Sequence, residues 1–243
     1  MPLYRERAAL PALVEALRRL QERFAAGGSH MRPILVDDGS DDGSADLAAE
    51  LMVSSGLSDA QILRHGQNRG LAAALRTGFA AGQGEVVCWL DADLSYPADL
   101  LVDLVALVQD GADVATVSPW HPSGQVTGVS RPRVLLSKGL SRACRLAART
   151  RSVHTWSAMV RAWRRPWLAR CLPERQGHCG VTESLLRAHA LGASIAELPA
   201  TLAGRAAGRT SMRVLPVIAR QLGLLGAAAT GRLGRASQVV DHG

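Results

Sequence analysis

Acidic side chains follow two short apolar runs. Residues 33–36 lead into Asp37 and Asp38, and residues 86–90 lead into Asp91-Ala92-Asp93. Ligands of open α/β sheets bind where parallel strands end, so we expect both clusters at one sheet edge. Carboxylates there repel a phosphate unless a divalent cation lies between them, and Mg²⁺ takes one or two carboxylates plus substrate phosphates. The pattern therefore predicts Mg²⁺ or Mn²⁺ and a diphosphate at Asp91 and Asp93, whereas Asp41 and Asp42 are typical of a turn and helix cap.

The elements that must position these acids alternate in the first half of the chain. Apolar spacing predicts helices at 8–24, 45–54, 69–81 and 97–108, and strands at 33–36, 61–64, 85–90 and 113–117. A strand before residue 8 is expected to be very short. Repeated β-α units of this length imply an α/β fold, a mostly parallel sheet with helices on both faces.

The second half is less regular. Residues 120–131 are rich in Pro, Gly and Ser and predict a long loop. Helices are expected at 133–149 and 181–191, a strand at 195–198 and a basic loop at 204–211. The stretch 214–230 contains Arg220 and Gln221 and is too polar to span a bilayer, so it either packs on the domain or lies on a membrane surface. We expect one large domain over 1–212 and a C-terminal helix and tail over 213–243.

Composition narrows the function classes. The 243-residue chain is 47% hydrophobic and carries a net charge of +7, with Lys138 as the only lysine. Arginine suits phosphate groups, although a general bias towards arginine explains most of these residues. Aromatic residues total 4%, too few to alternate with the basic residues as in single-strand nucleic-acid binding. The four cysteines form no Cys-x-x-Cys pair and predict reduced, cytosolic thiols. Arg5, Glu6 and Arg7 argue against a signal peptide.

Four motifs in a fixed order carry a family resemblance. They are Pro-Leu-Tyr-Arg-Glu at 2–6, Val-Asp-Asp-Gly-Ser at 36–40, Asn-Arg-Gly at 68–70 and Asp-Ala-Asp at 91–93. In this order they resemble the family 2 glycosyltransferases of the GT-A (Rossmann-like) fold. The resemblance covers roughly 2–212 and is strongest to the branch of dolichyl-phosphate mannose synthases and bacterial polyprenyl-phosphate glycosyltransferases. It implies an inverting transferase that uses a nucleotide sugar and Mg²⁺ or Mn²⁺.

The resemblance also implies roles for individual residues. The nucleotide sugar would contact Pro2, Tyr4, Glu6, Val36, Asp38, Asp91 and Ala92. The metal would bind Asp91 and Asp93, the second being the stronger ligand, while Ser95 stands where the family has a metal-supporting glutamine. The acceptor phosphate would contact Arg133, Ser137 and Arg205, the last in an Arg-x-x-Gly-x-Ser-like loop at 205–211. Asp93, Arg133 and Arg205 would carry catalysis.

Three functions remain open at this point. The first is transfer of a hexose from a GDP- or UDP-sugar to a polyprenyl or dolichyl phosphate at the cytoplasmic membrane surface. A lipid phosphate is already an anion near neutral pH, so this reaction needs no general base. The second is transfer to a hydroxyl of a saccharide or lipid, for which Glu183 is the candidate base, unless it is an ordinary acid in the first helical turn. The third is a non-catalytic nucleotide-sugar-binding module.

Overall fold

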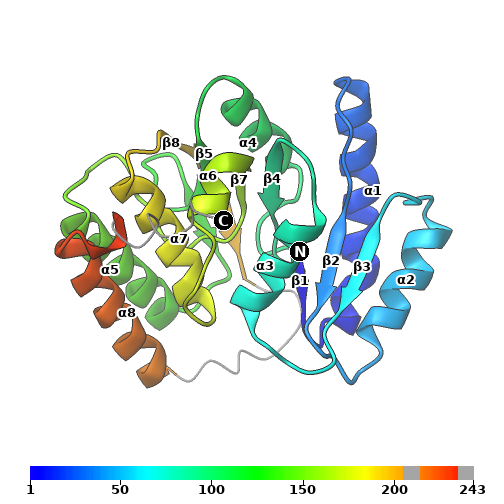
Figure 1. Ribbon diagram of the computed structural model, residues 1–243, viewed down its shortest axis with the longest axis horizontal. Coiled ribbons are helices and arrows are strands. Elements are labelled where there is room, and N and C mark those ends of the chain that lie inside the picture. Colours follow the sequence, from blue (N-terminus) through cyan, green and yellow to red (C-terminus); the bar gives the residue numbers. More distant parts are fainter. Residues whose placement is uncertain (205–213, 235–243) are drawn as a thin grey trace, which may run out of the picture.

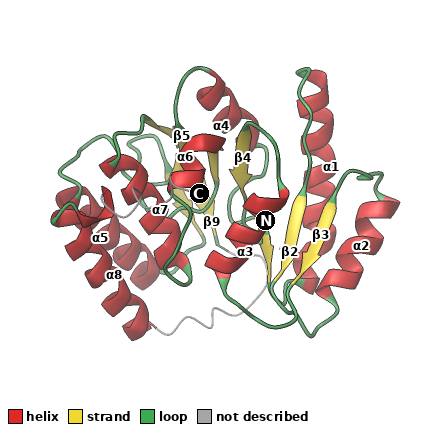
Figure 2. Ribbon diagram, in the orientation of Figure 1, coloured by secondary structure: helices red, strands yellow, loops and turns green. Residues whose placement is uncertain are grey.

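The computed structural model describes residues 1–204 and 214–234, and its strands lie between two layers of helices (Figures 1 and 2). The strands are β1 (Pro2–Leu3), β2 (Ile34–Asp37), β3 (Gln61–Arg64), β4 (Val86–Trp89), β5 (Val114–Ser118), β6 (Gln125–Thr127), β7 (Arg161–Arg164), β8 (Ile195–Pro199) and β9 (Thr201–Ala203). The α-helices are α1 (Leu10–Ala26), α2 (Ser44–Ser54), α3 (Leu71–Ala81), α4 (Leu100–Gln109), α5 (Arg131–Ala147), α6 (Arg165–Arg170), α7 (His178–Ala190) and α8 (Val214–Ala229).

Two sheets form the centre of the fold. In the first, β1, β2 and β3 are parallel, so that Leu3 is opposite Asp37. In the second, of order β4-β7-β5-β8, β7 runs antiparallel to both neighbours while β5 and β8 are parallel. Met1, at the start of the chain before β1, lies near Cys88 of β4, which places β1 beside β4. The ends of β2 and β4 therefore approach one edge, as the acidic motifs predict.

Each face of these sheets has its own apolar cluster. One cluster joins α1, α2 and α4 to β1, β2 and β5, and includes Leu13, Leu35 and Leu104. The other joins α3, α5, α7 and α8 to β4 and β7, and includes Trp89 and Trp163. The predicted arrangement of helices on both faces is therefore confirmed.

Several second-half elements differ from the prediction. The expected loop at 120–131 contains β6, which pairs in parallel with β9. Helix α7 begins at His178, three residues before the predicted start, so Glu183 lies beyond its first turn. Strand β7 and helix α6 were not predicted, because Arg161-Ala-Trp-Arg164 lacks the apolar alternation of a strand. Helix α8 lies against α5 and α7 with Leu224 buried, and no described helix is long and apolar enough to cross a bilayer.

Arg161 explains how a basic strand fits the centre of a sheet. Its side chain is 0% exposed. It donates hydrogen bonds to the backbone oxygens of Val181 at 2.6 Å and Trp156 at 2.7 Å, and to Thr116 Oγ1 at 3.3 Å. Burial lowers the pKa of Arg161 to about 9, which still leaves the guanidinium charged at neutral pH. One buried side chain thus joins β7 to β5, to the loop before it and to α7.

Replacing this arginine tests that role. We expect Arg161→Met to lower the free energy of unfolding by at least about 2 kcal/mol, because two buried carbonyls lose their donors at about 1–3 kcal/mol each. Urea denaturation followed by circular dichroism measures the change. The control is Arg32→Met at an exposed position. Equal stability of both variants would show that Arg161 does not tie these elements together.

Candidate active site

Asp38 is a buried clamp at the end of β2. Its side chain is 5% exposed and its oxygens accept hydrogen bonds from the backbone N–H groups of Arg69 at 2.9 Å and Gly70 at 2.7 Å. His65 Nδ1 lies 2.6 Å from Asp38 Oδ1, and His65 Nε2 lies 3.0 Å from Thr77 Oγ1 on α3. Both carboxylate oxygens are therefore used within the protein. The contact of Asp38 with a base or ribose stays a prediction, and its observed role is to position the 65–70 loop.

Gly39 allows this clamp to close. It has a φ of +76°, and a Cβ there would lie 2.5 Å from the backbone carbon of Gln67 and 2.7 Å from the nitrogen of Asn68. Residues other than glycine rarely adopt that φ, and the backbone of residues 67–68 leaves no room for a Cβ at this position. The glycine of the 36–40 motif is therefore required by the close approach of the 67–70 loop.

Asp37, unlike Asp38, has a carboxylate oxygen without a hydrogen-bond partner among the described residues. Its carboxyl is 3% exposed, and Oδ2 accepts a hydrogen bond from Ser40 N–H at 3.1 Å. Its Oδ1 is buried and has no hydrogen-bond partner among the described residues. A buried acceptor without a donor is costly, so this atom is suited to an N–H or O–H of a ligand. The family resemblance implies a nucleotide contact for Asp38 and none for Asp37.

The segment after β1 lies against the same loop. Arg5 forms an ion pair with Asp41 at 2.7 Å and its backbone N–H donates to Ser40 Oγ. Asp42 Oδ1 accepts from Ser44 N–H at 3.0 Å, which confirms its predicted turn role. Tyr4 is 41% exposed with the Arg5 guanidinium 5.3 Å from its ring centre.

The remaining predicted nucleotide contacts differ in their access to a ligand. Pro2 and Glu6 are partly buried, whereas Val36 and Ala92 are buried. Val36, at 0% exposure, therefore offers no surface to a ligand in this structure, and Ala92, at 6%, offers little.

Asp93 is held in one orientation by Ser95. Asp93 Oδ1 accepts hydrogen bonds from Ser95 Oγ at 2.7 Å and from Ser95 N–H at 3.0 Å. Ser95 Oγ thus orients the proposed metal ligand, which is a different task from ligating the metal. Leu94 has a φ of 49°, so the turn carries local strain directly after the two acids.

The donor set suits a hard divalent cation. The two carboxylates follow β4 directly, and no cluster of three or more His, Cys, Asp or Glu residues capable of holding a metal occurs within 1–204 and 214–234. Mg²⁺ commonly uses one or two protein carboxylates and completes its octahedron with water and substrate phosphates. Asp91 and Asp93 fit that pattern.

Tyr96 links this motif to α5. Its side chain is 5% exposed. Burial raises the pKa of the Tyr96 hydroxyl, the Asp91 charge raises it further and the Arg133 charge opposes both. Tyr96 therefore lies within electrostatic range of both charges, which brings the predicted metal motif and the predicted phosphate arginine to one place. Tyr96 was not predicted as a site residue. The signal in the sequence that could have indicated it is an aromatic residue three positions after Asp93.

The strands β6 and β9 border this site. Ala203 N–H donates to the backbone oxygen of Ser95 at 3.0 Å, and Gly204 N–H donates to that of Thr127 at 2.8 Å. The chain up to Gly204 is thus bonded to the Asp91–Ser95 turn. Arg205 and its loop lie outside the described residues. On α5, Ser137 is four residues after Arg133, so both occupy one helical face.

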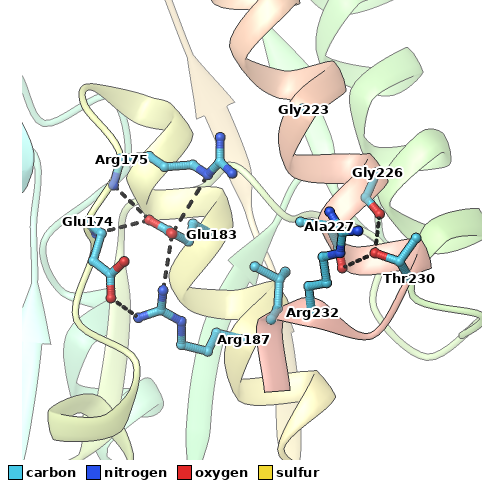
Figure 3. Close-up of a pocket in the computed structure, with 10 residues that line it drawn as sticks. Glu174, Arg175, Glu183, Arg187, Gly223, Gly226, Ala227, Thr230 and Arg232 are labelled. Atoms are coloured by element: carbon cyan, nitrogen blue, oxygen red, sulfur yellow. Dashed lines mark hydrogen bonds and ion pairs between the residues drawn. The ribbon is translucent and has the colours of Figure 1, made fainter. Parts of the chain in front are cut away.

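Glu183, the candidate base, is fully engaged (Figure 3). It is 3% exposed, and its Oε2 accepts from the backbone N–H groups of Glu174 at 2.9 Å and Arg175 at 2.8 Å. Its Oε1 accepts from Arg187 at 3.2 Å. Glu183 borders a cavity of about 590 Å³ between α7, the 174–175 loop and α8. These contacts give Glu183 a positioning role.

Curated relatives support the resemblance over most of the chain. The polyprenol monophosphomannose synthase of Mycolicibacterium smegmatis is 30% identical over 246 residues, covering 99% of this chain and 89% of that protein. The dolichol-phosphate mannosyltransferase of Pyrococcus furiosus is 30% identical over 147 residues, covering 60% of this chain and 40% of that protein. An undecaprenyl-phosphate 4-deoxy-4-formamido-L-arabinose transferase of Pseudomonas syringae pv. syringae is 36% identical over 169 residues, covering 68% and 46%. The chain thus spans less than half the length of the latter two.

Solved structures confirm the predicted GT-A fold. Glucosyl-3-phosphoglycerate synthase from Mycobacterium tuberculosis in complex with Mg²⁺ and UDP matches with a TM-score of 0.68 at 22% identity, over 93% of this chain and 77% of that chain. The same enzyme with Mn²⁺, UDP-glucose and glycerol 3-phosphate matches with a TM-score of 0.65 at 20% identity, over 96% and 78%.

The family model described as Glycosyl transferase family 2 matches residues 1–167. Those residues contain all four motifs and both acidic clusters of the site. The chain belongs to glycosyl transferase family 2 and is a glycosyltransferase.

Proposed function

We propose that this chain transfers a hexose from a GDP- or UDP-sugar to a polyprenyl or dolichyl phosphate, with inversion and with Mg²⁺ or Mn²⁺ as cofactor. The observation that carries the proposal is the Asp91–Ser95 turn, in which Ser95 orients the Asp93 carboxylate and is bonded to β9. Tyr96, next to this turn, lies within electrostatic range of Arg133, so a cation suited to a second phosphate lies in the same region. Relatives named for polyprenol, dolichol and undecaprenyl phosphate support this acceptor class.

The donor half consists of the loops after β2 and β4. Asp37 Oδ1 would accept a hydrogen bond from the nucleoside, while Asp38 fixes the loop below it. Asp91 and Asp93 would hold a divalent cation, which when bound neutralises the charge that develops on the leaving diphosphate. The hydrogen bond from Ser95 Oγ orients the Asp93 carboxylate before the donor binds. The carboxylate therefore needs little reorganisation during the reaction.

The acceptor half starts at α5. Arg133 and Ser137 would hold a phosphate on one helical face, and Arg205 would add a second cation. Bond formation then joins an acceptor phosphate oxygen to the anomeric carbon as the bond to the diphosphate oxygen breaks. Because that nucleophile is already anionic, positioning for in-line attack is sufficient. Both Glu183 oxygens accept hydrogen bonds within the protein, which agrees with a transfer reaction that needs no general base.

Membrane contact is part of the proposal, because a polyprenyl phosphate lies in a bilayer. Leu135 and Leu146 of α5 are 75% and 79% exposed. Exposed leucines beside arginines on one helix are typical of an interfacial surface. All four cysteines are free thiols, which supports a reducing, cytoplasmic setting. We therefore propose a peripheral enzyme on the cytoplasmic face of a membrane.

The metal site gives the first test of this proposal. We expect Asp93→Asn to reduce transfer by about 10²-fold or more, because the leaving diphosphate loses its charge stabilisation. We expect Ser95→Ala to raise the Mn²⁺ concentration needed for half-maximal rate. Transfer of labelled sugar to polyprenyl phosphate across a Mn²⁺ titration measures both. Asp103→Asn, an exposed acid on α4, is the control, and wild-type behaviour of Asp93→Asn would contradict the site.

Arg133 gives a test of the acceptor half. We expect Arg133→Gln to raise the KM for polyprenyl phosphate about tenfold or more while the KM for the nucleotide sugar stays unchanged, because a charged phosphate contact is lost. Steady-state kinetics with each substrate varied separate the two constants. Arg131→Gln, an exposed residue of the same helix, is the matched control. An effect confined to the nucleotide sugar would assign Arg133 to the donor instead.

Glu183 separates the lipid-phosphate acceptor from the hydroxyl acceptor. We expect Glu183→Gln to lower the melting temperature, because the contacts with Arg187 and the 174–175 backbone weaken, and to leave the shape of the pH–rate profile unchanged. The control is Glu174→Gln, whose side chain is 67% exposed. Loss of transfer together with one limb of the pH profile, with donor binding intact, would identify Glu183 as the base.

A further inference from the structure

A basic cavity lies on α5, next to the residues assigned to the acceptor and distinct from the cavity beside Glu183. It has a volume of about 210 Å³ and is lined by Trp120, Lys138, Ser141, Arg142, Arg145 and His154. This volume far exceeds the roughly 10–15 Å³ that one water needs, so the cavity has space for a polyatomic ion. Its lining contains no acidic residue.

The lining residues of α5 form one stripe. Lys138, Ser141, Arg142 and Arg145 are spaced by three and four positions, which places them on one helical face. Among the described residues, no carboxylate forms an ion pair with these three cations. Lys138 Nζ lies 5.0 Å above the centre of the Trp120 ring, which holds this ammonium at the cavity.

Two buried donors at the cavity have no partner. Ser141 is 3% exposed, and neither its Oγ nor the Nε1 of Trp120 has a hydrogen-bond partner among the described residues. Buried polar atoms are normally satisfied, so a missing partner at a cavity indicates a ligand. An O–H, an indole N–H and three cations together require an acceptor with several negatively charged oxygens.

His154 completes the lining without adding negative charge to it. Its Nδ1 lies 2.7 Å from Glu197 Oε2, and Glu197 Oε1 accepts the backbone N–H groups of His154 and Thr155, each at 2.8 Å. Glu197 does not line the cavity, and its two oxygens are occupied by these groups.

We propose that this cavity binds a phosphate group, at a site separate from donor and acceptor. The cavity begins next to Ser137 and extends along α5 away from the acceptor residues, because Arg142 is nine residues after Arg133 and so about 13 Å further along the helix at 1.5 Å per residue. The two sources of such a group are inorganic phosphate in solution and the headgroup of an anionic phospholipid. Leu135 and Leu146 are exposed at positions i and i+11, on the same face as Arg142 at i+7, which favours the headgroup.

Lys138 provides a direct reporter because it is the only lysine. Reductive ¹³C-methylation keeps its charge and gives one lysine signal by NMR, which Lys138→Gln distinguishes from that of the α-amino group. We expect inorganic phosphate to shift this signal in a saturable way. In Arg142→Gln/Arg145→Gln, which retains the reporter, we expect the dissociation constant to rise about tenfold or more. The matched control is Arg19→Gln/Arg32→Gln, which removes two exposed arginines elsewhere.

Vesicles of phosphatidylcholine with and without phosphatidic acid identify the source. Co-sedimentation that needs phosphatidic acid and weakens in Arg142→Gln/Arg145→Gln but not in the control assigns a lipid headgroup. A shift with inorganic phosphate and no dependence on phosphatidic acid assigns a soluble phosphate. Neither readout uses a nucleotide sugar or turnover, so both are independent of the proposed transferase reaction.

Smaller substitutions keep the test valid if the double variant unfolds. Ser141→Ala and Trp120→Phe each remove one donor, and Trp120→Phe keeps the aromatic ring under Lys138. We expect each to weaken phosphate binding about threefold to tenfold. The proposal is overturned if neither probe binds, if the cavity variants bind like wild type, or if only Arg133→Gln abolishes binding, which would assign the anion to the acceptor site.

Discussion

The buried carboxylate of Asp38 is the interaction on which the site depends. Two backbone N–H groups and His65 converge on it, so the loop before α3 is fixed to the end of β2. Gly70 in turn contacts the Gln176 side chain, and the neighbouring 174–175 backbone is held by Glu183. A chain of contacts therefore runs from the first sheet to α7. A charge buried this deeply is stable only because each oxygen has a donor.

A second set of contacts prepares the reaction centre. Ser95 orients Asp93 through its hydroxyl and binds β9 through its backbone oxygen, so the acidic turn and the strand before residue 205 share one anchor. Tyr96 lies within electrostatic range of both Asp91 and Arg133. In the proposed site, the metal ligand Asp93 is thus positioned by the residue that follows it two places later in the same turn. This arrangement suits a reaction whose catalysis consists mainly of positioning and charge stabilisation.

The sequence predicts the helices and strands that have a clear apolar periodicity, and the acidic residues at the ends of strands. Strand β3 has the predicted bounds, and the acids follow β2 and β4 as expected. Strand β7 could not be predicted, because the burial of Arg161 depends on carbonyls at 156 and 181 that only the fold brings near. Asp37 and Asp38 are adjacent and chemically identical, so only the structure shows that Asp38 is engaged and Asp37 Oδ1 is not. The cavity on α5 joins residues 120, 138–145 and 154, which no local motif connects.

The proposed nucleophile is a phosphate anion, so the most direct measurement compares two acceptors with the same polyprenyl chain. Purified protein with Mn²⁺ and labelled GDP- and UDP-hexoses is incubated with polyprenyl phosphate or with the corresponding polyprenol, and the anomeric configuration of any product is determined. We expect glycolipid from the phosphate alone, with the configuration of the donor inverted. Glycosylation of the free polyprenol, or a product of retained configuration, would contradict it.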